Sequence, residues 1–214
     1  MAETAIAQKT EVFGKKERRL LTDPFNDNNP ITIQVLGICS ALAITAAMKP
    51  SLVMAIAVVF VCAFSNLAIS LLRNTIPGRI RMIVQLTVIA FLVTMVEQSL
   101  KAFEYDLYKQ LSVYIGLIIT NCIIMGRLEA FAMGNKPWQS FLDGVGNGVG
   151  YGVILLAVAF FRELLGKGQL FGAQILPDWY IGNSLMINPP AAMFLIGIFI
   201  WIQRSRNKEL IDIS

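Results

Sequence analysis

The sequence predicts an all-α membrane protein with six transmembrane helices, arranged as two inverted three-helix repeats. Hydrophobic residues make up 56% of the 214 residues and charged residues only 15%, whereas charged residues are about 25% of an ordinary soluble domain. The mean hydropathy of +0.63 agrees with this balance. The apolar residues form long unbroken runs rather than the short alternating runs of a membrane β-barrel, so we expect helices.

The chain divides into a polar arm (residues 1–30), a six-helix domain (31–203) and a polar tail (204–214). The expected helical segments are 31–48, 52–72, 80–96, 111–125, 144–165 and 185–202. A helix needs about 20 residues to cross a bilayer, and the second and fifth segments reach that length. The first and fourth segments fall short of it, so we expect helices 1 and 4 to be short or broken.

The distribution of Lys and Arg predicts the orientation, because cytoplasmic loops are enriched in both. With the N-terminus inside, 13 of the 18 Lys and Arg residues lie on the inner side. The five on the outer side are Lys49, Lys101, Lys109, Arg162 and Lys167. We therefore expect both termini in the cytoplasm, and we interpret the basic excess as a topology signal rather than a nucleic-acid-binding surface.

Matching features at a near-constant offset indicate an internal repeat. Cys39 and Cys122 are 83 residues apart, Asn66 and Asn147 are 81 apart, and the "MKP" turn at 48–50 matches "MGNKP" at 133–137. The halves are residues 31–100 and 111–203. Because three helices are an odd number, the second half enters from the opposite side, which gives the inverted repeat typical of many transporters.

The two repeated cysteines lie in the short segments. Counted from the segment starts, Cys39 lies roughly 13 Å and Cys122 roughly 16 Å into a core of about 30 Å, from opposite sides. The inverted repeat then predicts that they meet near the midplane. Ser40, Thr120 and Asn121 adjoin them and offer hydrogen bonds to a thiolate or sulfide, and three glycines are expected to allow close backbone approach: Gly37, Gly116 and Gly126.

A lone cysteine in a membrane helix is more often a small buried apolar residue than a ligand. Cys62 also lies at mid-depth, but its counterpart region "GNGVGYG" contains no thiol. The repeat therefore favours Cys39 and Cys122 as a ligand pair. Two thiolates are half of a Cys₄ set, so a cluster would need the other half from a partner.

The remaining polar residues give weaker signals. The absence of His excludes His-ligated haem and zinc. The acidic residues Glu97, Glu129, Asp143 and Glu163 fall near the predicted span ends, where an ion-coupling carboxylate is less expected. Adjacent Arg162 and Glu163 are interpreted as a solvated interfacial pair in preference to an internal ion pair.

Other residues are interpreted as structural. Asn66 and Asn147 are typical of helix–helix hydrogen bonding. The glycines of "GVGNGVG" (144–150) indicate helix packing rather than dinucleotide binding, because no strand precedes them. Three tryptophans fit an interfacial belt: Trp138, Trp179 and Trp201.

Several stretches carry a family resemblance. The segments "NNPITIQVLGICSALAIT", "LSVYIGLIITNCIIMGRLEAFAM", "SFLDGVGNGVGYG", "FRELLGKGQLFG" and "PPAAMFLIGIFIW" closely resemble the D subunits of sodium-translocating NADH:quinone oxidoreductases, over about residues 28–201. The E subunits of the related Rnf electron-transport complexes are similar and form the main alternative. The resemblance implies an intramembrane [2Fe–2S] centre shared with an E-type subunit, two Cys from each, and the matching positions are Cys39 in "GICSA" and Cys122 in "TNCIIMG".

The resemblance also implies a function and partners. The centre would relay electrons across the bacterial inner membrane, from an FAD-bearing NADH-oxidising subunit to flavins on the outer side, coupled to Na⁺ export and reduction of ubiquinone. FAD, FMN and riboflavin would belong to other subunits. The E-type subunit would form a pseudo-symmetric heterodimer with this chain inside a six-subunit complex that also holds A, B, C and F subunits, and the chain would not be active alone. The lipid bilayer is the other expected partner, and nucleic acid is not one.

Two other classes of function remain open. Inverted repeats also build secondary transporters and channels, in which the cysteines would be inert, although the shortage of mid-membrane polar groups argues against this class. A purely structural assembly subunit is the third possibility. Visible absorption separates an iron–sulfur protein from a transporter, and iron analysis with and without the two thiols separates it from an assembly subunit.

Overall fold

The computed structural model describes residues 21, 22, 24, 29–103, 105–170, 173–174 and 184–206, and these are mostly helical. The predicted all-α class is confirmed for this part of the chain. The main helices are α3 (Ile38–Ile44), α4 (Met48–Leu72), α5 (Arg81–Phe103), α6 (Tyr105–Ile119), α7 (Cys122–Arg127), the π-helical turn η1 (Leu128–Ala132), α8 (Pro137–Lys167), α9 (Ser184–Ile187) and α10 (Pro189–Arg206). Two short strands, β1 (Gln169–Leu170) and β2 (Ala173–Gln174), pair in antiparallel fashion after α8.

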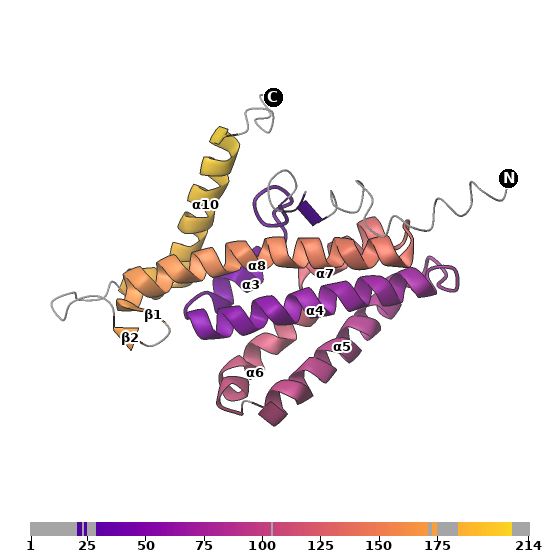
Figure 1. The fold of residues 1–214 in the computed structure, drawn as a ribbon, viewed down its shortest axis with the longest axis horizontal. Coiled ribbons are helices and arrows are strands. Elements are labelled where there is room, and N and C mark those ends of the chain that lie inside the picture. The colour runs from indigo at the N-terminus through magenta and orange to yellow at the C-terminus, as the bar shows by residue number, and fades with distance from the viewer. Residues whose placement is uncertain are drawn as a thin grey trace, which may run out of the picture.

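Helices α4 and α8 lie side by side along the long axis of the molecule (Figure 1). Three glycines at four-residue spacing on α8 face α4. A Cβ atom at Gly144 would lie 2.8 Å from the Ala63 Cα atom, and one at Gly148 would lie 2.9 Å from the Val59 Cα atom. At Gly152 the nearest atom would be the Ala55 Cβ, at 3.2 Å. The packing role expected for the "GVGNGVG" stretch is confirmed, because only small residues allow this approach.

The first apolar segment is not one helix. Residues 29–37 form turns, α3 has only seven residues, and a further turn at 45–47 separates it from α4. The Asn29 side chain stabilises the first turns, since its Oδ1 atom accepts hydrogen bonds from the backbone N–H groups of Ile31 and Thr32 at 3.0 and 3.3 Å. The "MKP" stretch, predicted as a turn, is instead the first turn of α4, a position where proline needs no N–H donor.

The fourth apolar segment is broken as expected. Helix α6 ends at Ile119, and α7 begins at Cys122 after Thr120 and Asn121. Before the break, α6 forms a hairpin with α5, and the Tyr108 hydroxyl donates a hydrogen bond to Glu97 Oε1 at 3.2 Å.

Four helices of the described residues are long and apolar enough to cross a bilayer, whereas the sequence predicted six. They are Met48–Leu72, Arg81–Ala102, Ser112–Ala132 and Pro137–Gly166. Segment 31–48 does not form a helix long enough to cross a bilayer, because turns interrupt it. Segment 185–202 is split at Asn188, where two prolines follow and α10 restarts. In Figure 1, α10 leaves the end of α8 at a steep angle. The inverted repeat stays a prediction.

Some predictions fall outside the described residues. These are most of the arm (1–30), most of the tail (204–214), and Trp179. The other two tryptophans are exposed, Trp138 by 49% and Trp201 by 72%.

Candidate metal centre

Cys39 lies in the first turn of α3, and its side chain is exposed. The turn begins at Gly37, whose backbone adopts a left-handed conformation with φ of 79°. The Ser40 hydroxyl donates a hydrogen bond back to the Gly37 carbonyl oxygen at 2.9 Å. The glycine and the serine therefore fix the turn that presents Cys39.

Cys122 is the first residue of α7, and its side chain is also exposed. Asn121 caps this helix, because its Oδ1 atom accepts a hydrogen bond from the Ile123 N–H at 3.3 Å. Amide side chains favour this position because they satisfy a backbone donor that has no partner within the helix. Each cysteine thus lies in the first turn of a short helix that follows an interruption of the chain.

The structure brings the two cysteine-bearing turns together. Asn121 Nδ2 donates a hydrogen bond to Ser40 Oγ at 3.4 Å. Ser40 directly follows Cys39, and Asn121 directly precedes Cys122. The predicted meeting of these segments is therefore observed, and the role of the two thiols as metal ligands stays a prediction.

Cys62 has a different environment. Its side chain is fully buried in α4, where the α8 glycines pack closely. A buried thiol with apolar neighbours behaves as a small hydrophobic side chain. Burial thus separates Cys62 from the other two cysteines, and no further Cys, Asp or Glu of the described residues joins them in a metal-binding group.

The three glycines predicted to allow close approach behave differently. A Cβ atom at Gly37 would lie 2.9 Å from Tyr151 Cε2, and one at Gly126 would lie 3.1 Å from Leu36 Cδ1. At Gly116 a Cβ atom would meet nothing within 4 Å. The prediction was wrong for Gly116, which lies on an exposed part of α6.

Arg162 and Glu163 are not a solvated pair. Their side chains are only 2% and 5% exposed. The Arg162 guanidinium donates to Thr45 Oγ1 at 2.5 Å and to the Ile187 carbonyl oxygen at 2.6 Å. Glu163 Oε2 accepts a hydrogen bond from the Met48 N–H at 2.5 Å. The interpretation as a solvated pair was wrong because each side chain is buried against the end of another helix.

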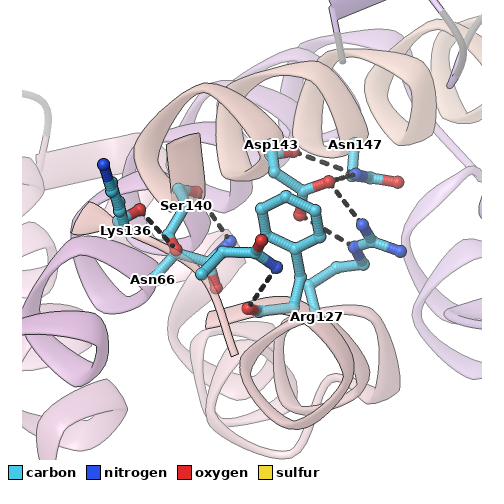
Figure 2. Close-up of polar contacts among 8 residues, drawn as sticks. Asn66, Arg127, Lys136, Ser140, Asp143 and Asn147 are labelled. Atoms are coloured by element: carbon cyan, nitrogen blue, oxygen red, sulfur yellow. Dashed lines mark hydrogen bonds and ion pairs between the residues drawn. The ribbon is translucent and has the colours of Figure 1, made fainter. Parts of the chain in front are cut away.

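A second buried ionic group lies at the other end of α8 (Figure 2). Arg127 forms an ion pair with Asp143, and its Nε atom donates to Asp143 Oδ2 at 2.9 Å. Asn147 Nδ2 donates to Asp143 Oδ1 at 3.1 Å and to the Asp143 carbonyl oxygen at 2.9 Å. Asp143 is 2% exposed and lies inside a candidate span rather than at its end. The sequence pattern did not predict this ion pair, since sixteen residues separate its partners.

The two asparagines of the predicted repeat make different contacts. Asn66 Nδ2 donates to the Ser140 carbonyl oxygen at 3.2 Å and so joins α4 to α8 (Figure 2). The expected helix–helix role is confirmed for Asn66. The donor bonds of Asn147 stay within α8.

The fold and these two turns define a multi-span helical membrane protein that presents two thiols from interrupted helices. The chain belongs to the family of Rnf-Nqr subunits, membrane proteins whose family model matches residues 18–200. The resemblance seen in the sequence motifs is thereby confirmed at the level of the family.

The relatives are named as the D subunit of the Na(+)-translocating NADH-quinone reductase. The relative from Shewanella halifaxensis is 57% identical over 203 residues, covering 92% of this chain and 97% of the relative. The relative from Photobacterium profundum is 58% identical over 195 residues, covering 89% of this chain and 93% of the relative. A third, from Shewanella oneidensis, is 56% identical over 203 residues, covering 92% of this chain and 97% of the relative.

Proposed function

We propose that this chain is the D-type membrane subunit of a Na⁺-translocating NADH:quinone reductase. The similarity to proteins of that name supports the proposal, because it extends over nearly the full length of both sequences. In this role the chain lies in the bacterial inner membrane with both termini cytoplasmic, and it serves an enzyme complex that exports Na⁺. The E subunit of an Rnf complex is the alternative within the family, and the neighbouring genes distinguish the two.

The observation that carries the mechanism is the difference between the cysteines: two exposed thiols lie on turns that contact each other, and the third thiol is buried elsewhere. Cys39 and Cys122 project from turns that are hydrogen-bonded to each other, while Cys62 is buried in α4 where α8 packs. A [2Fe–2S] centre takes four thiolates. Two exposed thiolates from this chain fit half of that set, and an E-type partner supplies the other half. When bound, such a centre supplies one-electron redox chemistry.

The chain's own residues hold the thiols in place. Gly37 and Asn121 set the two turns, and the hydrogen bond between Asn121 and Ser40 ties them together. Apolar side chains pack around the turns, among them Ile118 and Ile123, which are 1% and 0% exposed. The FAD, FMN and riboflavin of the complex lie on other subunits, and the A, B, C and F subunits complete it around the heterodimer.

Co-expression tests the shared centre. Expressed alone, the chain should hold no stable iron, because two thiols do not complete a Cys₄ set. Co-expressed with its E-type partner, it should yield about two iron atoms per heterodimer, visible absorption and the electron paramagnetic resonance (EPR) signal of a reduced [2Fe–2S] centre. Stoichiometric iron in the isolated chain would refute sharing, and a colourless, iron-free heterodimer would favour the transporter class.

Cysteine variants test the ligand assignment. Cys39→Ala and Cys122→Ala should each abolish quinone reduction by the assembled complex, a larger loss than the about 10- to 100-fold typical of changes around metal ligands. Cys62→Ala is the matched control. It removes only a buried sulfur atom and should retain most of the activity. A Cys62→Ala complex as inactive as the other two would show the assignment to be wrong.

A further inference from the structure

Tyr151 links α8 to the candidate metal centre, although α8 contributes no thiol. Its side chain is fully buried, and its hydroxyl oxygen lies 2.7 Å from Ser40 Oγ. Its ring packs against Gly37, where an added Cβ atom would lie 2.9 Å from Cε2. The tyrosine therefore contacts the turn that presents Cys39 with both its hydroxyl and its ring.

The hydrogen bonds around Ser40 determine which group donates. A serine hydroxyl has one proton and two acceptor lone pairs. Its proton is used on the Gly37 carbonyl oxygen at 2.9 Å, and one lone pair accepts from Asn121 Nδ2 at 3.4 Å. The Tyr151 hydroxyl is then the donor to the remaining lone pair. Every hydrogen-bonding position of Ser40 is occupied, and its partners come from three separate parts of the chain.

These contacts place Ser40 at the point where both cysteine turns are joined. Ser40 follows Cys39 along α3, and its partner Asn121 precedes Cys122 at the start of α7. Asn121 also caps α7 with its other amide atom. A displacement of the Ser40 hydroxyl would therefore change the separation of the two thiols. Helix α8 packs closely on α4 and provides a rigid support for Tyr151 (Figure 1).

We propose that Tyr151 is a positioning residue that fixes the separation of Cys39 and Cys122 by donating a hydrogen bond to Ser40. The role in a metal centre rests on the proposed function, while the effect on thiol separation does not. In this assignment Tyr151 acts through Ser40 and Asn121.

The Tyr151→Phe change isolates the hydroxyl, because phenylalanine keeps the ring that packs on Gly37. One intramolecular hydrogen bond contributes about 0.5–1.5 kcal/mol net. Its loss should raise the population of displaced turn arrangements by about 2- to 12-fold. Tyr105→Phe is the matched control, since it removes the same group from a side chain that is 64% exposed and outside this network.

The first measurement needs no metal. Nitroxide labels are attached to Cys39 and Cys122 of the full chain in a Cys62→Ala background, expressed alone and reconstituted in lipid nanodiscs. Dipolar EPR then gives the distribution of label separations. Tyr151→Phe should broaden this distribution and lower the melting temperature by only a few degrees, and Tyr105→Phe should leave the distribution unchanged. A Tyr151→Phe distribution as narrow as that of the control would overturn the proposal.

A double-variant comparison tests whether Tyr151 acts through Ser40. Ser40→Ala should broaden the distribution, and adding Tyr151→Phe to it should broaden it no further, because the shared partner is already absent. Full additivity of the two changes would contradict the proposed path. If one single variant folds poorly, the other single variant alone still tests whether loss of the shared bond broadens the distribution.

The second measurement uses the heterodimer with its iron. Tyr151→Phe should retain iron, shift the midpoint potential of the centre and accelerate iron loss to a chelator by about 2- to 12-fold. If the heterodimer never contains iron but the label separations broaden, the proposed function fails and the positioning role stands. If iron is present and neither the label separations nor the rate of iron loss changes, the positioning role fails alone.

Discussion

At the scale of single residues, the backbone conformation of Gly37 decides where Cys39 lies. Its φ of 79° is in the left-handed region, which costs other residues about 1–2 kcal/mol because their Cβ atom approaches the next carbonyl oxygen. A side chain at this position would also meet the Tyr151 ring at 2.9 Å. The glycine therefore serves both the turn and the close packing beneath it.

Gly37→Ala should damage the candidate metal centre. The left-handed strain alone predicts a loss of about 1–2 kcal/mol in the free energy of unfolding, and the contact with Tyr151 adds to it. The iron content of the heterodimer should fall together with the free energy of unfolding. Thermal unfolding of the detergent-solubilised heterodimer and iron analysis measure both effects. Gly116→Ala is the control, because nothing lies within 4 Å of its added Cβ atom, and equal behaviour of the two variants would contradict this role of Gly37.

The sequence indicated the two turns that carry Cys39 and Cys122 better than it indicated the residues that support these turns. Cys39 and Cys122 could be selected because the repeat offset gives each a counterpart, and Ser40 and Asn121 because they adjoin the thiols. Tyr151 could not be found this way, since it lies 111 residues from Ser40 and its neighbours "GNGVGYG" indicate only helix packing. A tyrosine at the end of a glycine-rich helical stretch is a weak signal, and only the tertiary structure shows its partner.

At the scale of elements, Arg162 and Glu163 act on the ends of helices other than their own. The first N–H groups and last carbonyl groups of a helix have no partner within it. Arg162 donates to the Leu42 carbonyl oxygen near the end of α3 and to the Ile187 carbonyl oxygen at the end of α9. Glu163 accepts from the Met48 N–H at the start of α4. The interruptions that shorten α3 and α9 are therefore stabilised by side chains from α8.

Arg162→Met should destabilise the protein strongly. Methionine fills part of the space but leaves several buried carbonyl groups without a donor, and each costs about 1–3 kcal/mol. We expect a loss of about 3 kcal/mol or more in the free energy of unfolding. Unfolding in mixed detergent measures it. Arg79→Met removes the same charge from an exposed loop position and should cost less than about 1 kcal/mol. A loss for Arg162→Met as small as for Arg79→Met would show that these hydrogen bonds do not stabilise the helix ends.

The length of a helix could be predicted where the sequence is uniformly apolar. It could not be predicted where side-chain hydrogen bonds stabilise the end of a helix. Helix α4 matches the predicted segment 52–72 apart from its first turn. The break before Cys122 was expected from the short fourth segment. The first segment was likewise expected to be short or broken. The positions of its turns, at 29–37 and 45–47, were not predicted, because Asn29 and Arg162 stabilise them through contacts that apolar periodicity does not reveal.

At the scale of the whole molecule, contacts between helix ends define two opposite ends of the helical bundle. At one end, Arg73 donates to the Asn135 carbonyl oxygen at 2.6 Å, and Arg81 forms an ion pair with Glu129. These contacts join the end of α4 and the start of α5 to the region just before α8. At the other end, Glu163 meets the start of α4, and Arg162 donates to the Asn188 carbonyl oxygen.

The basic residues differ between these two ends. The first end carries Arg73, Arg79, Arg81 and Lys136, none of them buried. The second carries Lys49 and Lys167, together with an Arg162 that is buried and used in hydrogen bonds. Positive residues near span ends favour the cytoplasm. The helix-end contacts place the loops that are rich in Lys and Arg at the first end of the bundle and the loops that are poor in them at the second end. We therefore expect the first end to face the cytoplasm.

The orientation can be tested with reporter fusions. Alkaline phosphatase is active only outside the cytoplasm, and green fluorescent protein fluoresces only inside. A fusion after Lys101, in the last turn of α5, should show phosphatase activity without fluorescence, because α5 runs from the Arg81 end of the bundle to the opposite end. A fusion after Arg79 is the matched control one span earlier and should fluoresce, as should a fusion at Ser214. Fluorescence from the Lys101 fusion would reverse the assignment of both ends and, with it, the cytoplasmic location of the termini.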